Sequence, residues 1–188
     1  PLNMTVALPK DAIPGRGGVR VVLQSRLADE LAGVREYMER YPYTCFEQRA
    51  SKAVALRNEH SWEVLMGNLP SYLDRDGLVK YFPLMDEGSD SLTSYILAIG
   101  AEAGYEIPEY AKNRMQKGLT GFVEGRVVRY SALPTADLAI RKVAALAALS
   151  RGETEINPRW LDGFSIEPNL WPTSAVLDWH SLLKRAPV

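Results

Sequence analysis

One cysteine and one glutamine stand three residues apart in the stretch RYPYTCFEQRASKA, residues 40–53. Cys45 is the single cysteine among the 188 residues. Thr44 followed by Glu47 matches the Ser/Thr-x-x-Glu capping box, which predicts a helix with Thr44 as its N-cap and Cys45 as its first residue. Free N–H groups and the positive dipole at a helix start favour a thiolate. The position therefore predicts a more nucleophilic sulfur than a site in the middle of a helix provides.

The partner of this sulfur would be the side-chain carbonyl carbon of Gln48. Residues three apart are neighbours on a helical turn, so Cys45 and Gln48 are expected to lie side by side. Placement within one chain supplies effective molarities on the order of 10⁵ M or more, which makes displacement of ammonia from an amide feasible. The product would be an internal thioester, an electrophile that amines, hydroxyls or water can open. Such a bond must be kept dry, and aromatic walls exclude water. The candidates for such apolar cover are Tyr41, Tyr43 and Phe46, with Trp62 as a further candidate.

Two other interpretations of Cys45 remain open at this stage. A lone cysteine in a helical domain is most often a small buried hydrophobic residue. A cysteine hydrolase would need a histidine, and the two histidines of the chain, His60 and His180, lie in no local signature of a thiol protease. His60 is expected as an exposed residue at a helix end, and His180 on the surface or in the packing of a helix.

Composition bounds the class of protein. With 188 residues and 46% apolar content, the chain can bury a substantial core in one domain, or in one domain and part of another. The net charge of −1 and the absence of a basic stripe with interleaved aromatics argue against nucleic acid as a partner. No apolar run approaches the roughly 20 residues that span a bilayer, so membrane attachment would need an anchor outside this segment. One cysteine permits no internal disulfide and no cysteine-based metal cage. No metal or cofactor is predicted.

Hydrophobic periodicity predicts a β segment followed by helices. Apolar residues alternate over 4–8 and over 19–23, with Pro and Gly between the two runs, which indicates two short strands. From Leu27 the period becomes helical, with Leu27, Leu31, Val34 and Met38 on one face until Pro42. The change at about residue 26 is the predicted domain boundary.

Further helices are predicted at regular spacing, after the one that begins at Thr44. They cover 60–69, 90–104, 108–125, 135–152 and 171–185. Asp90 is the expected N-cap and Gly104 the expected C-cap of the second of these. The segments 73–83 and 157–172 combine turn formers with large aromatics and correspond to loops of a repeated helical hairpin. Antiparallel helix pairs in series form an all-α solenoid or a closed α/α ring. The predicted fold class is therefore mainly all-α.

The stretch YPYTCFEQRAS (41–51) resembles the thioester region of the alpha-2-macroglobulin family, and above all its bacterial periplasmic members. GLVKYFP (77–83), GSDSLTSYILAIGAEAGY (88–105) and WPTSAVLDWHSLL (171–183) resemble later parts of the same thioester domain, in the expected order. The run before residue 26 resembles the end of the strand-rich CUB domain that flanks it. The resemblance implies that residues 1–26 are a CUB-like β segment. It implies that 27–188 are the N-terminal part of a thioester domain, an incomplete α/α toroid of antiparallel helical hairpins.

What the resemblance implies for function is a protease inhibitor and not an enzyme. In that family a protease cuts a bait region elsewhere in the chain, the thioester domain is released, and a lysine amine of the protease captures the glutamyl carbon. By position, Cys45 and Gln48 would form the thioester. The surrounding residues carried over from the family are Thr44 and Glu47 as supporting motif, and Tyr41, Tyr43 and Phe46 as shield. Thr44 and Phe46 depart from many relatives, which carry Gly and a small or aliphatic residue at these places.

The partners implied by the resemblance are proteases, with other proteins of the cell envelope as further candidates. The implied location is the periplasm, with attachment to the inner membrane as a lipoprotein. Thioester-containing complement components use a distant histidine to form an acyl intermediate. The comparable loop here, 157–172, contains no histidine, so the resemblance implies direct attack of amines on the thioester. The alternative is a helical-repeat scaffold in a macroglobulin-like envelope protein that binds without covalent chemistry, with Cys45 as a structural residue.

Overall fold

The computed structural model describes residues 5, 7, 10–16, 18, 32–130, 136–152, 154–161 and 167–185. The contacts of the chain divide it into two units, Pro1–Ala32 and Gly33–Val188. The strands predicted at 4–8 and 19–23, and the boundary predicted at residue 26, lie largely outside the described residues. The CUB-like segment and its boundary therefore stay predictions, and the fold described below is that of the second unit.

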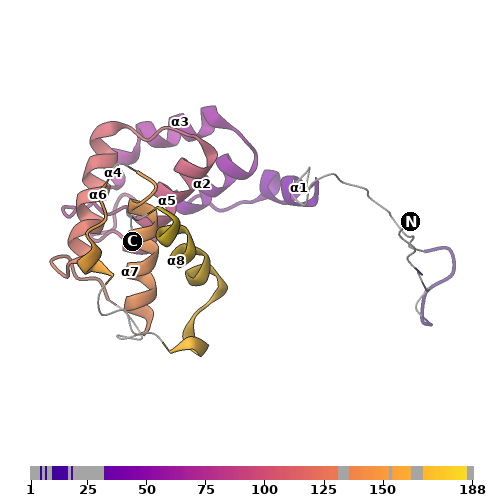
Figure 1. Cartoon of the computed structure of the whole chain (residues 1–188). Helices are drawn as coiled ribbons and strands as arrows, with labels where there is room; N and C mark the ends of the chain where they lie inside the picture. The colour runs from indigo at the N-terminus through magenta and orange to yellow at the C-terminus, as the bar shows by residue number, and fades with distance from the viewer. Residues whose placement is uncertain are drawn as a thin grey trace. The chain divides into compact units, whose positions relative to one another are not determined.

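The described residues are mainly helical, which confirms the predicted fold class (Figure 1). The α-helices are α1 (Ala32–Arg40), α2 (Phe46–Ala55), α3 (Glu59–Gly67), α4 (Leu69–Tyr72), α5 (Asp90–Ala103), α6 (Glu109–Val123), α7 (Ala136–Leu149) and α8 (Thr173–Arg185). Two 3-10 turns, η1 (Pro158–Trp160) and η2 (Pro168–Leu170), lie between α7 and α8. Among the described residues, β pairing is limited to isolated bridges of Val79 with Leu73 and with Ser89.

Helices joined by short loops pack against each other as hairpins, α2 with α3 and α5 with α6. A row of neighbours runs from α2 to α5, from α5 to α7 and from α7 to α8, while α6 packs against both α5 and α7. Figure 1 shows α8 alongside α7. Helix α5 therefore packs directly against α2, the helix whose start carries Cys45.

The core follows the helical period of the sequence. In α6, Ala111, Met115, Leu119 and Phe122 recur every three or four residues and are all buried. Large fully buried side chains from the other helices meet them in one cluster, among them Phe46, Trp62, Leu65, Leu92, Ile96 and Leu146. Burial of such side chains is the dominant favourable term in folding, at roughly 1.5–3 kcal/mol for each. The apolar face predicted for the first helix differs, because Val34 is 46% exposed.

The predicted C-cap of α5 is confirmed, whereas its N-cap and the end of α3 differ from the prediction. Gly104 ends α5 in the left-handed conformation, with φ of 72°, as predicted for a C-cap. The N-cap of α5 is Ser89 and not Asp90, because the Ser89 hydroxyl accepts a hydrogen bond from the N–H of Leu92 at 3.2 Å. The helix predicted over 60–69 ends earlier, because α3 ends at Gly67 and Pro70 lies in the first turn of the short helix α4.

The carboxylate of Asp90 is instead used inside the core. It accepts hydrogen bonds from Nε of Arg141, at 2.9 Å, and from Nη2 of the same guanidinium. Arg141 also lies 5.4 Å from the ring centroid of Phe122, within the range of a cation–π contact. Hydrogen bonding to Asp90 raises the pKa of Arg141 above its ordinary value, although burial opposes the shift. The pair fastens α5 to α7 next to α6.

The loop between α4 and α5 is built around the buried carboxylate of Asp74. One oxygen accepts hydrogen bonds from the backbone N–H groups of Asp76 and Leu78, at 2.9 and 2.8 Å. The other accepts from the N–H of Gly88 at 2.7 Å and from Nη2 of Arg129 at 2.6 Å. Arg129 also donates to the carbonyl of Gly88 and to the carboxylate of Asp76. Both ends of the loop are thus tied to one charged pair.

This arrangement sets the protonation of Asp74. Burial raises the pKa of the carboxyl, but the hydrogen bonds from Gly88, Leu78 and Arg129 together outweigh it and hold the pKa below its ordinary value of 3.8. The carboxylate is therefore ionised at neutral pH and stabilises the folded chain there.

The backbone at Gly77 approaches its surroundings too closely for any side chain. A Cβ at this position would lie 2.3 Å from the carbonyl oxygen of Arg114, and its φ of +87° is in the region that favours glycine. Gly104 has a similar φ of +72°, but a Cβ there would meet nothing within 4 Å.

We therefore expect Gly77→Ala to cost clearly more stability than Gly104→Ala. The left-handed conformation alone costs about 1–2 kcal/mol in Gly104→Ala. Gly77→Ala adds an overlap with backbone, so a cost above about 4 kcal/mol, at the extreme of single substitutions, is expected. Urea unfolding of the two variants measures the difference, and equal midpoints would contradict the tight packing of this loop.

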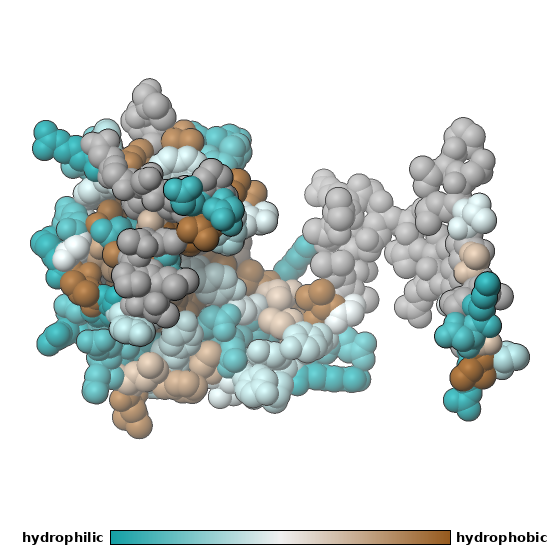
Figure 2. Space-filling model, turned by 90° about the horizontal axis from the view of Figure 1, so that it is seen from below, coloured by the Kyte–Doolittle hydropathy of each residue, from teal (hydrophilic) through white to brown (hydrophobic). Residues whose placement is uncertain are grey.

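On the face shown in Figure 2, hydrophobic residues of the helical unit are interspersed with hydrophilic ones. Exposed apolar side chains include Phe82 and Leu84 of the loop before α5, and Val176 and Leu177 of α8. None of the helices in the described part of the chain is both long and apolar enough to cross a bilayer.

Candidate functional site at the start of α2

Cys45 occupies the N-cap of α2, one residue later than predicted for the cap. Its backbone is extended, with φ of −64° and ψ of 165°, and the helix begins at Phe46. Thr44 is exposed and lies outside the helix, so the predicted Thr44–Glu47 capping box is wrong. Two overlapping patterns of the same spacing compete here, and the one formed by Cys45 and Gln48 is used. Gln48 accepts the hydrogen bond from the N–H of the cap residue, while the carboxylate of Glu47 accepts one from Ser51 instead.

The side chain of Gln48 folds back over Cys45. Its Oε1 accepts a hydrogen bond from the backbone N–H of Cys45, with a distance of 3.2 Å between nitrogen and oxygen. In return, the sulfur of Cys45 faces the backbone N–H of Gln48 in the reciprocal arrangement of a capping box. Because sulfur is a weak acceptor, this second contact falls short of a full hydrogen bond. The predicted neighbours are therefore brought together, with the carboxamide of Gln48 held at the cysteine.

Cys45 lies largely away from solvent, and Gln48 does so in part. Cys45 is in no disulfide and is 7% exposed, and Gln48 is half-buried. The residue after Cys45 is held by a backbone hydrogen bond, in which the N–H of Phe46 donates to the carbonyl of Tyr81 at 3.0 Å. Tyr81 belongs to the loop that Asp74 organises. The start of α2 is thus attached to the loop that is built around Asp74.

Glu47 does not take part in capping and instead connects α2 to α5. Its Oε1 accepts a hydrogen bond from the hydroxyl of Ser51 at 2.7 Å, one turn further along the helix. The Ser51 hydroxyl also lies 2.8 Å from the hydroxyl of Tyr95 on α5. This chain of three polar groups holds the carboxylate of Glu47 on the side of α2 that faces α5. Neither Ser51 nor Tyr95 was singled out from the sequence, because only the fold brings them together.

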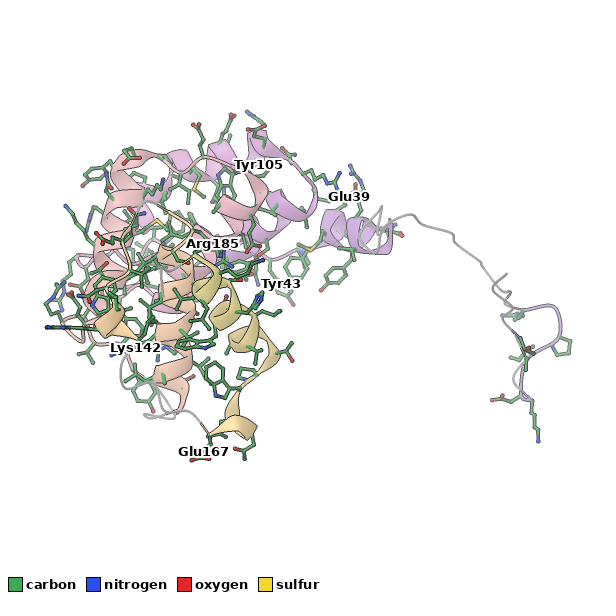
Figure 3. The ribbon with its side chains drawn as sticks, viewed as in Figure 1. Glu39, Tyr43, Tyr105, Lys142, Glu167 and Arg185 are labelled. Atoms are coloured by element: carbon green, nitrogen blue, oxygen red, sulfur yellow. The ribbon has the colours of Figure 1, made fainter. Side chains whose placement is uncertain are left out.

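The aromatic residues predicted as a shield lie in two different environments. Phe46 is fully buried, and its ring centroid is 4.7 Å from that of Tyr72 in the core. Tyr41 and Tyr43 contact each other edge to face, with 5.3 Å between centroids. Tyr43 lies in the linker between α1 and α2 and is 61% exposed (Figure 3). Shielding by these residues stays a prediction.

Trp62, the fourth aromatic candidate, is placed elsewhere by the fold. Its indole N–H donates to the carbonyl of Glu106 at 2.7 Å, and its ring centroid lies 5.7 Å from that of Tyr105. Tyr105 is labelled in Figure 3. These contacts join α3 to the turn between α5 and α6, so the burial of Trp62 is explained by packing of that turn.

The histidines give no support to a cysteine hydrolase. His60 is exposed at the start of α3, where its Nδ1 lies 3.7 Å from a carboxylate oxygen of Glu63. His180 is exposed on α8. Within the described residues, Cys45 has no hydrogen bond to either histidine, and no cluster of three or more His, Cys, Asp or Glu side chains is placed to hold a metal ion.

A cavity of about 650 Å³ lies between α3, α5, α6 and the end of α7, away from Cys45. Its walls combine apolar residues such as Met66 and Ile107 with charged ones such as Lys112 and Arg151. Arg151 is already paired with Glu102 at 2.8 Å. Burial raises the pKa of Asp178, also near Arg151, although the arginine opposes this shift.

The sequence matches no family of known proteins, and it is significantly similar to no curated protein. Among solved structures, the chain is similar to native alpha-2-macroglobulin from Escherichia coli, in a crystal structure that spans the residues from domain MG7 to the C-terminus. The TM-score is 0.65 and the sequence identity 18%, over 82% of this chain. The likeness spans 28% of the length of the other chain. At this identity it concerns the fold alone, and the chain is macroglobulin-like in fold.

Proposed function

We propose that Cys45 and Gln48 form an internal thioester. In this step the sulfur of Cys45 attacks the side-chain carbonyl carbon of Gln48, a carbon–sulfur bond forms, and the carbon–nitrogen bond breaks. The thiol proton leaves with the amide nitrogen as ammonia. No oxidant or cofactor is needed, because the oxidation state of carbon and sulfur is unchanged.

The observation that carries this proposal is the hydrogen bond from the N–H of Cys45 to Oε1 of Gln48. That oxygen gains negative charge when the carbonyl carbon becomes tetrahedral, and a backbone N–H already directed at it stabilises the charge without reorganisation. The same N–H would polarise the carbonyl of the finished thioester and assist its later opening. The low exposure of Cys45 supports the proposal as well, since it limits hydrolysis.

The function of the thioester would be covalent capture of a protease. A lysine amine attacks the acyl carbon, an amide forms with Gln48, and Cys45 leaves as a thiol. Each molecule reacts once, so the protein acts as a stoichiometric inhibitor and not as an enzyme. The macroglobulin-like fold supports this assignment, together with the motif around Cys45. A periplasmic location, a lipoprotein anchor outside this segment, and contacts with other envelope proteins complete the proposal.

The test is the chemical nature of the complex with a protease. The full-length protein is expected to form a conjugate that survives boiling in denaturant, and a protease whose lysines have been dimethylated should form none, because a tertiary amine cannot yield a stable amide. Equal conjugation of both proteases would contradict capture through lysine. Preferential ester formation with glycerol over amide formation with methylamine would contradict direct attack by amines.

The burial of Cys45 among core residues also fits a second function, a helical-repeat scaffold that binds partners without covalent chemistry. In that case protease complexes would dissociate completely in denaturant, whether or not lysines are blocked.

A further inference from the structure

A second hollow lies between α2 and α3, beyond the turn that carries Gln48. Its volume is about 290 Å³, close to the lower end of the range for small-ligand pockets. The apolar part of its lining consists of Ala53, Leu56 and Val64. The polar part includes Arg49 and Lys52 of α2 and His60 of α3. The hollow therefore combines a small apolar surface with a basic rim.

The two cations of α2 have no carboxylate partner among the described residues. Arg49 is half-buried and forms no ion pair there. Lys52 is also half-buried, and its Nζ donates to the main-chain carbonyl of Glu39 at 3.0 Å. The carboxylate of Glu39, which is labelled in Figure 3, is engaged by Arg35 at 3.1 Å. By contrast, the half-buried arginines 129, 141 and 151 each have a carboxylate within 3 Å.

The start of α3 adds to the positive potential of this hollow. Asn58, which also lines it, is the N-cap of α3 and accepts a hydrogen bond from the N–H of Ser61 at 2.9 Å. The positive end of the helix dipole therefore faces the same space as Arg49 and Lys52. His60 also lines the hollow, and the carboxylate of Glu63 lies 3.7 Å from its Nδ1. An anion in the hollow would meet two cations and a helix start.

We propose that this hollow binds a carboxylate carried on a short apolar group. The guanidinium of Arg49 presents a fork that matches a carboxylate, Lys52 adds a second charge, and the apolar group would cover Leu56 and Val64. The C-terminal residue of a peptide and a free small organic acid share this chemistry. The site goes beyond the proposed thioester function and does not depend on it, since Cys45 and Gln48 do not line the hollow.

The test uses methyl NMR of Leu56 and Val64 in the full chain, titrated with four probes. Two are N-acetyl-leucine and its neutral amide, and two are a short peptide ending in leucine with a free or an amidated C-terminus. The acids are expected to shift these methyl signals and to bind at least tenfold more tightly than the amides. Tighter binding of the peptide acid identifies a peptide C-terminus as the source, and equal binding of both acids identifies a free organic acid.

Variants separate the site from general charge effects. Arg49→Gln and Lys52→Gln should each weaken binding of the acids about tenfold, and Arg49→Lys should weaken it less. The matched control is Arg57→Gln, which removes a nearby exposed cation that does not line the hollow, and it should leave affinity unchanged. Binding should also persist in Cys45→Ala, so failure of the thioester would not affect it. Equal binding of acids and amides, no shift at the methyl groups, or an equal loss in Arg57→Gln would overturn the proposal.

Discussion

Replacing Cys45 with alanine is expected to abolish covalent incorporation of methylamine at Gln48. The sulfur is the only group in the chain that can activate this carboxamide in the proposed mechanism, and an ordinary amide does not exchange with amines at neutral pH. Gln48→Ala should give the same complete loss, because it removes the acyl carbon. Intact mass and peptide mapping of the amine-treated protein measure the incorporation.

Thr44→Ala provides the matched control for this pair of variants. Thr44 is adjacent to Cys45, exposed and outside the helix. Its replacement should therefore leave methylamine incorporation near the level of the protein without a substitution. Cys45→Ala removes one small buried group and should change the free energy of unfolding by only about 1 kcal/mol. Incorporation that persists in a folded Cys45→Ala protein would show that another group activates Gln48.

Replacing Arg129 with methionine is expected to destabilise the folded chain by about 3–5 kcal/mol. The side chain of Asp74 is 1% exposed, so the substitution leaves a buried carboxylate without its counter-charge. Because the Asp74 loop also supplies the carbonyl that holds the N–H of Phe46, the loss should reach the start of α2. Urea unfolding measures the stability, and amide hydrogen exchange at Leu78, Gly88 and Phe46 measures the local effect.

Arg126→Gln and a pH series serve as controls for this prediction. Arg126 pairs with Glu124 on the surface, and loss of an exposed pair should cost only about 0–1 kcal/mol. The pKa of Asp74 is below its ordinary value of 3.8 in the folded chain, so its stabilisation is present above that value and is lost as the pH falls through the folded pKa. A similar cost for Arg129→Met and Arg126→Gln at pH 7 would contradict a central role of the buried pair.

The longer helices α2, α5, α6, α7 and α8 could be predicted because their apolar residues recur with the helical period over ten residues or more. In α6 the pattern from Ala111 to Phe122 alone defines the buried face, and Gly104 marks the end of α5 because few other residues adopt its conformation. The helical period does not fix where a helix starts. At α2 and α5, adjacent residues could each serve as N-cap, and the choice depends on contacts made by Gln48 and by Arg141.

The environment of the candidate site depends on contacts distant in sequence, which the sequence could not reveal. Asp74 and Arg129 are 55 residues apart, and Ser51 and Tyr95 are 44 apart. Local patterns identified Cys45 and Gln48 because their pairing lies within one turn. They could not identify Tyr81, whose main-chain carbonyl holds the start of α2 and whose side-chain type is irrelevant to that bond.

Whether the acyl bond between Gln48 and Cys45 exists in the native protein is tested most directly by intact mass and thiol titration of freshly purified full-length protein. The proposal predicts a mass short by one ammonia and no thiol that titrates in rapid denaturation. After methylamine treatment, the mass should rise by one methylamine and one thiol should appear. A full mass with Cys45 titrating as a free thiol before any treatment would contradict the proposal.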